Sequence, residues 1–148
     1  MGFKEAIRTV IKEKYATFSG RASRSEFWWF QLFFYLIFFS LGAVIGIFVS
    51  ASRYEQSIPG YLIAIGVVTG ILFVALIIPH IALAVRRLHD RNFSGWWYLG
   101  FIIANSVPHV GSLASIALLV VFVSPGTKGP NRFGADPLNP QFTAEVFA

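Results

Sequence analysis

The sequence predicts an all-α integral membrane protein with an N-terminal amphipathic helix, two transmembrane helices and a third apolar window. Of the 148 residues, 55% are hydrophobic and 17% are aromatic, which excludes a disordered chain. The 12 Lys+Arg and 7 Asp+Glu residues avoid three windows, Phe27–Ser52, Gln56–Val85 and Asn92–Thr127. A soluble domain carries charge on the outer face of nearly every element, so uncharged windows of 26, 30 and 36 residues indicate lipid.

The composition also limits the chemistry that the chain can perform. It contains no cysteine, so a disulfide, a thiolate metal site and a thiol nucleophile are excluded. We predict no metal site and no cofactor. The formal net charge of +5 would suggest nucleic acid in a soluble protein. Here we interpret the positive charge as a signal of membrane orientation, because Lys and Arg collect in the cytoplasmic loops of membrane proteins. We therefore expect no nucleic-acid partner.

We divide the chain into a basic amphipathic interfacial segment (1–26), a transmembrane helical domain (27–124) and a polar C-terminal tail (125–148). Within 3–18, apolar residues recur at helical spacing and basic residues occupy much of the rest. The apolar positions are Phe3, Ile7, Val10, Ile11, Tyr15 and Phe18. Such a helix either lies flat on the headgroups or packs on the protein's own loops.

The first long window predicts a transmembrane helix that begins near Ser23. Ser23 and Glu26 have the spacing of a capping box at a helix start. Trp28 and Trp29 then open the span, as expected of the aromatic belt at the membrane boundary. A helix that continues to Val49 would be roughly 34 Å long, enough to cross a hydrocarbon core of about 30 Å.

The second window predicts another transmembrane helix, with Pro59 suited to its start and Val85 near its end. Pro79 should kink this helix or unwind it locally. The histidines inside apolar windows, His80 and His109, each follow a proline. We expect structural roles for both, because a proline leaves backbone carbonyls that need a donor.

The third window allows two interpretations, so the chain has three or four membrane helices. As one helix, its 36 residues would be roughly 54 Å long, more than the roughly 45 Å of a bilayer with headgroups. Residues 105–112 are rich in helix breakers and polar groups. The window is either one kinked crossing or a broken hairpin with segments near Trp96–Ala104 and Leu113–Val123. The hairpin would leave the tail cytoplasmic, and the single crossing would place it outside.

The basic residues predict the orientation. Six Lys and Arg residues precede the first window, three lie in 86–91, and only Arg53 lies between the first two windows. The positive-inside rule therefore places the N-terminus and the 86–91 loop in the cytoplasm.

A candidate site for an anionic headgroup or a partner lies on that predicted cytoplasmic face. Arginine suits bidentate contact with phosphate or carboxylate. The alternative is that the charges pair with one another, for example Arg86 with Asp90 four residues later. In the tail, we expect Arg132 to reach Glu26 or Asp90. The candidate binding residues are Arg21, Arg24, Glu26, Arg86, Arg87, His89, Asp90, Asn131 and Arg132.

Three motifs resemble a known family. They are residues 20–30 (GRASRSEFWWF), residues 86–97 (RRLHD followed by SGWW) and residues 125–137 (PGT followed by NRFGADP). In this order, with apolar spans between them, they are similar to the YhaH-like family of small bacterial inner-membrane proteins, catalogued as a domain of unknown function. The resemblance implies a multi-pass protein of the bacterial inner membrane and implies no chemistry.

We therefore expect a non-enzymatic membrane scaffold or a lipid- or partner-binding protein, with no catalytic residue. Its candidate partners are membrane lipids, anionic phospholipid headgroups among them, and further copies of the chain as a homo-oligomer. One alternative is a small oligomeric transporter or channel subunit that uses Asn105, Ser106, His109 and Ser112. The other is an interfacial lipid-modifying enzyme that uses Glu26, His89 and Asp90, although adjacent helical residues do not face each other.

Overall fold

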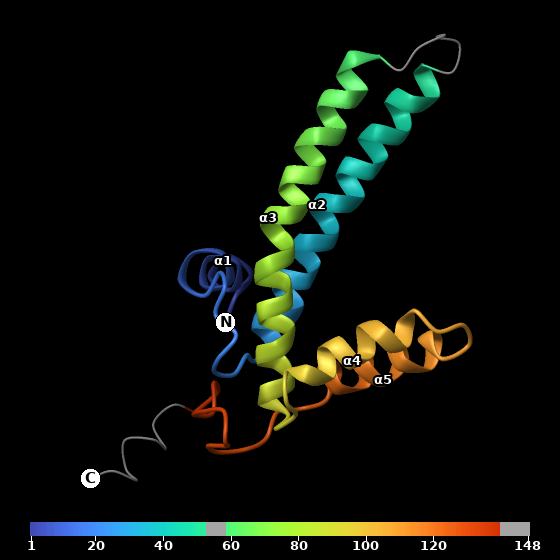
Figure 1. The fold of residues 1–148 in the computed structure, drawn as a ribbon. Coiled ribbons are helices and arrows are strands. Elements are labelled where there is room, and N and C mark those ends of the chain that lie inside the picture. The colour runs from blue at the N-terminus through green and yellow to red at the C-terminus, as the bar shows by residue number, and fades with distance from the viewer. Residues whose placement is uncertain (53–58, 140–148) are drawn as a thin grey trace.

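The computed structural model describes residues 1–52 and 59–139. Within these residues the secondary structure is helical, and this confirms the predicted class. The elements in order are α1 (Phe3–Arg8), a short π-helix η1 (Thr9–Glu13), α2 (Arg24–Ala51), α3 (Gly60–Asp90), α4 (Trp96–Asn105) and α5 (Gly111–Val123). Figure 1 shows α2 and α3 side by side as a long hairpin, with α4 and α5 forming a second, shorter hairpin that leaves its lower part at a steep angle.

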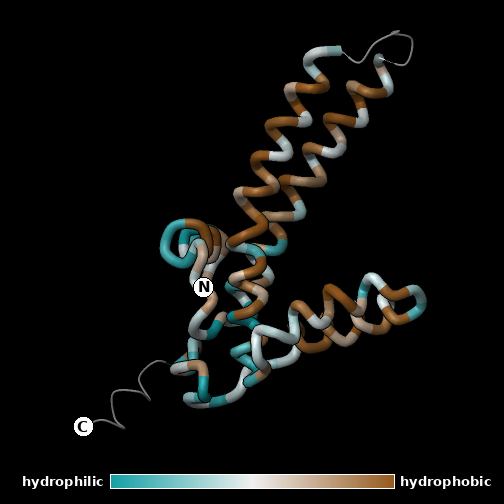
Figure 2. The backbone as a smooth tube through the Cα atoms, viewed as in Figure 1, coloured by the Kyte–Doolittle hydropathy of each residue, from teal (hydrophilic) through white to brown (hydrophobic). Residues whose placement is uncertain are grey.

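The helices α2 and α3 are both long and apolar enough to cross a membrane. Their 28 and 31 residues correspond to about 42 and 46 Å, more than the hydrocarbon core of about 30 Å. Outward-facing side chains are apolar and exposed, such as Phe39 at 81%, and Figure 2 shows hydrophobic residues along most of both helices. Each helix therefore extends beyond the hydrocarbon. We call the end that holds Arg24 and Asp90 the foot.

The third apolar window forms the hairpin, and the single kinked crossing is wrong. Residues 106–110 interrupt the helix, and His109 adopts a positive φ of 67°, which a non-glycine residue rarely does. Across the turn, Ser115 Oγ donates to Asn105 Oδ1 at 2.7 Å. With 10 and 13 residues, α4 and α5 are only about 15 and 20 Å long. The chain therefore returns to the foot after α5.

The N-terminal segment packs against the long helices instead of on loops. Ala6, Thr9 and Val10 are buried, and the Phe3 ring meets the Trp29 ring edge to face, with centroids 5.7 Å apart. The regular helix ends at Glu13, earlier than the apolar pattern over 3–18 predicts. Lys4, Arg8 and Lys12 remain exposed, so the polar face of the segment stays turned away from the protein.

Pro79 does not unwind α3, which is helical without a break from Gly60 to Asp90. Proline lacks the N–H that would bond to the carbonyl four residues earlier, which here is the carbonyl of Ala75. The Tyr15 hydroxyl donates to that carbonyl at 2.5 Å. Tyr15 therefore fills the role that the sequence suggested for His80, and it ties the N-terminal segment to α3.

The buried core of the molecule lies at the foot end of α2 and α3. Phe27, Phe30 and Phe34 of α2 pack there against Leu83 and Leu88 of α3. Phe122, near the end of α5, joins the same cluster, with its ring centroid 4.4 Å from that of Phe27. This cluster holds the ends of three helices together, and the charged motifs of the sequence lie directly beside it.

Candidate functional site

Five charged side chains form a buried network at the foot, which we call the charge network. They are Arg21, Glu26, Arg86, Arg87 and Asp90, with side-chain exposures between 0% and 4%. Such residues are almost never fully buried unless they are paired. The network joins three segments that are far apart in the sequence: the approach to α2, the end of α3 and the tail after α5.

Asp90 is the centre of the network because two arginines share its carboxylate. Arg21 donates to Asp90 Oδ1 through Nε at 2.9 Å and approaches the same oxygen through Nη2 at 2.8 Å. Arg87, three residues earlier on α3, donates to Asp90 Oδ2 through Nη1. The charges therefore pair with one another, as in the alternative that the sequence left open, but Asp90 is bound by Arg87 and Arg21 and not by Arg86.

The remaining donors of Arg21 hold the tail. Its Nη2 donates to the carbonyl of Thr127 at 2.5 Å, and its Nη1 donates to the carbonyl of Gly129 at 2.6 Å. Gly129 has a φ of +72°, a conformation that glycine adopts without steric cost. One guanidinium thus binds α3 through a carboxylate and the tail through backbone carbonyls.

Arg87 fixes the end of α5 in the same way. Its Nε and Nη2 both lie 3.1 Å from the carbonyl of Phe122, and Nη2 also donates to the carbonyl of Ser124. The last carbonyls of a helix lack partners within that helix. A buried guanidinium supplies them here, so Arg87 sets how the α4–α5 hairpin attaches to α3.

The second ion pair of the network joins α2 to α3. Arg86 Nη1 donates to Glu26 Oε1 at 2.5 Å. Ser23 is the N-cap of α2, and its Oγ accepts from the Glu26 N–H at 3.2 Å. The capping box is half formed, because the Glu26 carboxylate turns to Arg86 instead of back to the helix start.

The tail closes the end of α3. The Thr127 N–H and Oγ1 both donate to the Asp90 carbonyl, at 2.9 and 3.1 Å. Asn131 Nδ2 donates to the His89 carbonyl at 2.9 Å. Gly126 passes so close that an added Cβ would lie 2.6 Å from Asp90 Cγ. These contacts cap α3 with chain from more than thirty residues later in the sequence.

Arg132 does not reach a carboxylate, and the expected pairing with Glu26 or Asp90 is wrong. It donates to the Asn92 carbonyl at 2.8 Å and lies 4.7 Å over the Phe133 ring. Both expected carboxylates are already bound by other arginines. Phe133 in turn stacks on His89, with ring centroids 3.9 Å apart and planes 4° from parallel.

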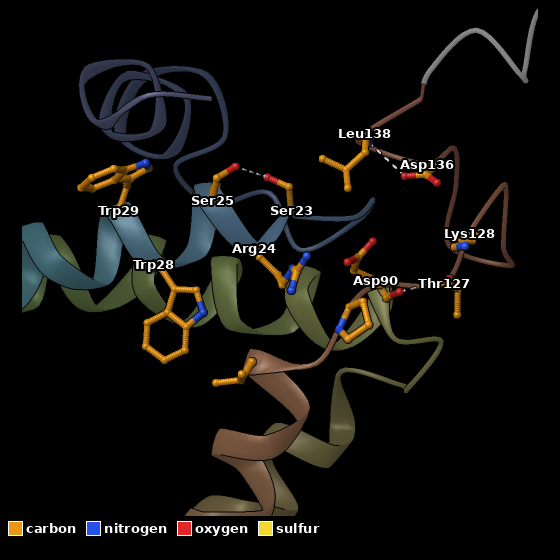
Figure 3. Close-up of a pocket in the computed structure, with 13 residues that line it drawn as sticks. Ser23, Arg24, Ser25, Trp28, Trp29, Asp90, Thr127, Lys128, Asp136 and Leu138 are labelled. Carbon is orange, nitrogen blue, oxygen red and sulfur yellow. Dashed lines mark hydrogen bonds between the residues drawn. The ribbon is translucent and has the colours of Figure 1, made fainter.

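Of the nine predicted site residues, Arg24 is the one that projects away from these contacts. It is exposed and lines a pocket of about 670 Å³ together with Lys128, Ser23, Ser25 and the two tryptophans of α2. Figure 3 shows Arg24 on the first turn of α2 and Lys128 on the tail, with Asp90 between them. Within the described residues, neither of them has a carboxylate within salt-bridge distance.

The pocket also contains residues that sequence reasoning missed. Lys128 and Ser25 were not among the candidates, because nothing local shows that the tail folds back against α2. Asp136 lies at the same pocket, but its carboxylate accepts the N–H groups of Gly129 and Leu138, at 3.0 and 2.9 Å. The aromatic walls are half exposed, with Trp28 at 38% and Trp29 at 39%.

The arrangement offers little for acid–base or metal chemistry. Glu26 and Asp90 are bound by arginines, and His89 stacks on Phe133 with Nδ1 3.1 Å from the Gly20 carbonyl. In the part of the chain that the structure describes, no three His, Asp or Glu residues are grouped to hold a metal ion. What the geometry supplies is a rigid charged base beside an open basic pocket.

Comparisons with known proteins match most of the chain. A family model described as "Protein of unknown function (DUF805)" matches residues 15–135, which include the first two motifs and all but the last two residues of the third. The chain is 38% identical over 127 residues to the inner membrane protein YhaI of Escherichia coli K12, covering 86% of this chain and 91% of that one. It is 35% identical over 128 residues to the inner membrane protein YhaH of the same strain, covering 86% and 92%. No solved structure matches.

Proposed function

This chain belongs to the family described as protein of unknown function (DUF805), and from that premise we propose a multi-pass inner-membrane protein that binds an anionic phospholipid headgroup without catalysis. The similar proteins from Escherichia coli are named as inner membrane proteins, and α2 and α3 have the length and apolarity to cross a membrane. The charge network holds the protein together, and the basic pocket beside it binds the headgroup.

The foot faces the cytoplasm in this proposal. Nine basic residues lie in the segment up to the first residue of α2, Arg24, and at the end of α3, and only Arg53 lies in the sequence between the two helices. Basic residues near the ends of transmembrane helices collect on the cytoplasmic side. The cytoplasmic leaflet also carries the anionic lipids that attract such residues, so the pocket faces the leaflet that supplies its ligand.

The observation that carries the proposal is the separation of the basic side chains at the foot into two groups. Arg21 and Arg87 use their guanidinium groups on Asp90 and on backbone carbonyls. Arg24 and Lys128 instead project into the open pocket.

The other walls of the pocket also suit a phospholipid. Ser23 and Ser25 are hydrogen-bonded to each other through their hydroxyls at 3.1 Å, so the less buried Ser25 can donate to a phosphate oxygen, and the start of a helix favours an anion. Trp28 and Trp29 provide the half-exposed aromatic surface that occurs at headgroup level. The combined chemistry fits a phosphate attached to an apolar chain.

Native mass spectrometry of the intact protein after gentle extraction tests this site. We compare the wild type with Arg24→Gln and Lys128→Gln, and measure the phosphatidylglycerol retained per chain. Arg132→Gln is the matched control, because it also removes one exposed positive charge. The Arg132 side chain lies over the Phe133 ring and does not line the pocket. All three variants keep the charge network.

The size of the loss separates a built site from general attraction. A basic residue near an anionic surface contributes about 1 kcal/mol, or about fivefold in affinity. A hydrogen bond to a charged group contributes about 1.5–3 kcal/mol, or roughly 10- to 100-fold. We expect Arg24→Gln to reduce retention by at least about tenfold and Arg132→Gln by far less. Equal losses in all three variants would contradict the site.

A second candidate function, a small transporter, is favoured by one observation. Gln31 Oε1 and His80 Nδ1 are buried without a hydrogen-bond partner among the described residues. Both residues line a pocket of about 260 Å³, with Tyr35, Tyr98 and Ser115. If this pocket conducts protons, His80→Phe should slow proton flux into vesicles that contain the protein, because the imidazole can accept and release a proton. Flux equal to that of empty vesicles would remove this candidate.

A further inference from the structure

The α4–α5 hairpin presents apolar side chains on all of its sides. No residue of α4 is buried. Ile103 on α4 is 60% exposed, and Ile116 and Val120 on α5 are 58% and 57% exposed. A helix that lies on a membrane surface has one polar face, and this hairpin has none apart from its turn. Its surroundings are therefore acyl chains.

The hairpin is too short to cross those acyl chains and is held where it leaves α3. At about 15 and 20 Å, neither helix spans a core of about 30 Å. Arg87 binds the carbonyls of Phe122 and Ser124 at the end of α5. At the start of α4, Gly95 lies so close to α3 that an added Cβ would be 2.6 Å from Val85 Cγ1.

The N-terminal segment contacts the long helices from the level of Trp29 away from the foot, and the hairpin extends from the foot to the level of Tyr35. Phe3 contacts Trp29, and Tyr15 bonds to Ala75. On the hairpin, Ser115 of α5 lines the pocket that also includes Tyr35. Figure 1 shows α1 and the hairpin projecting from different sides of the long helices.

The level of Trp29 corresponds to one boundary of the hydrocarbon. From Trp29 to Ala51, α2 still rises about 33 Å, which matches a core of about 30 Å. The charged face of the N-terminal segment, with Lys4 and Lys12 exposed, fits the headgroup level there. The hairpin begins near this boundary, where Gly95 meets Val85, and its Ser115 lines a pocket with Tyr35, about 9 Å farther along α2 than Trp29. It therefore lies among the acyl chains of the leaflet nearest the foot.

We infer that the α4–α5 hairpin is a one-leaflet insertion that gives the protein a preference for membrane whose foot-side leaflet is convex. Two helices about 10 Å wide and about 15–20 Å long occupy roughly 350 Å² of that leaflet. The hairpin occupies none of the opposite leaflet. Added area in one leaflet is accommodated best where that leaflet curves outward. This inference does not depend on the headgroup site.

A depth measurement tests the placement of the hairpin. Because the chain has no cysteine, single cysteines at Ile103, Ile116 and Phe39 can each carry a fluorophore in vesicles. Lipids brominated near the headgroup should quench the first two labels most, and lipids brominated near the chain ends should quench the label at Phe39 most. Quenching of the hairpin labels by aqueous iodide, or their cross-linking to a second copy in place of lipid quenching, would overturn the inference.

An orientation measurement tests the curvature preference. We reconstitute the protein into small and large vesicles and label a cysteine at Lys128 with a membrane-impermeant reagent. Since the outer leaflet of a small vesicle is strongly convex, the ratio of chains labelled from outside to chains protected inside should be several-fold higher in small vesicles than in large ones. Equal ratios in both sizes would overturn the preference.

A variant then separates the hairpin from the rest of the chain. Ile116→Lys places a charge on α5 that should draw it toward the headgroups, and Ile116→Met is the control of similar length. We expect the size dependence to disappear in the first variant and to remain in the second. If the depth labels confirm insertion but both variants keep the size dependence, the curvature preference does not come from the hairpin.

Discussion

Asp90→Asn tests the charge network most severely, because one carboxylate there serves two buried arginines. The substitution keeps the size of the side chain and removes its charge. Arg21 and Arg87, whose side chains are 1% and 0% exposed, would retain backbone carbonyls and one amide oxygen as acceptors, but no negative charge. Breaking a buried pair by removing one partner costs about 3–5 kcal/mol, because the remaining charge is left buried without compensation.

The exposed pair between Arg8 and Glu13 supplies the control. Its side chains are 74% and 51% exposed, and the two charged atoms are 3.4 Å apart. Exposed pairs of this kind contribute about 0–1 kcal/mol. Glu13→Gln thus removes the same type of charge from a position where solvent replaces the lost partner.

The assay is thermal unfolding of the detergent-solubilised protein, followed by circular dichroism. For a chain of this size, a loss of about 3–5 kcal/mol lowers the melting temperature by roughly 10 °C. We expect that change for Asp90→Asn and less than about 3 °C for Glu13→Gln. If the two substitutions lower the melting temperature equally, the network does not hold the foot together.

Two further predictions concern single contacts. Gly126→Ala places a Cβ 2.6 Å from Asp90 Cγ, so the tail must move away, and protease should cut it faster in detergent; an unchanged cleavage rate would show that the close approach is not required. Tyr15→Phe leaves the Ala75 carbonyl without its donor and should cost about 1–3 kcal/mol in thermal unfolding. The same change should cost far less in a Pro79→Ala background, where the helix N–H is restored, and equal costs in both backgrounds would contradict the role assigned to the hydroxyl.

The features of the fold that depend on local sequence pattern could be predicted from the sequence. Uncharged windows identified α2 and α3, since lipid requires long apolar helices. The polar stretch after Asn105 indicated the break between α4 and α5, although the alternative of one crossing stayed open. Only the returning tail excludes that alternative, because Thr127 and Asn131 cap the same end of α3 that precedes the hairpin.

The pairing of the charges could not be predicted in the same way. The sequence places five arginines near two carboxylates, and spacing alone favoured Arg86 with Asp90. Which arginine binds Asp90 depends on how the tail packs at the foot. The tail carbonyls accept the remaining hydrogen bonds of Arg21, and these contacts join residues more than a hundred positions apart. Lys128 was missed for the same reason, since only the folded tail brings it to the pocket that Arg24 also lines.

The same-side position of the first and third motifs is the central claim, and sidedness labelling tests it most directly. Single cysteines at Ser19 and Lys128, both exposed, would be treated with a membrane-impermeant reagent in intact spheroplasts and in inverted inner-membrane vesicles. We predict that both cysteines react in the inverted vesicles and that neither reacts in spheroplasts. Labelling of Lys128 from the face opposite to Ser19 would contradict it, because the tail could not then reach Arg21 and Asp90.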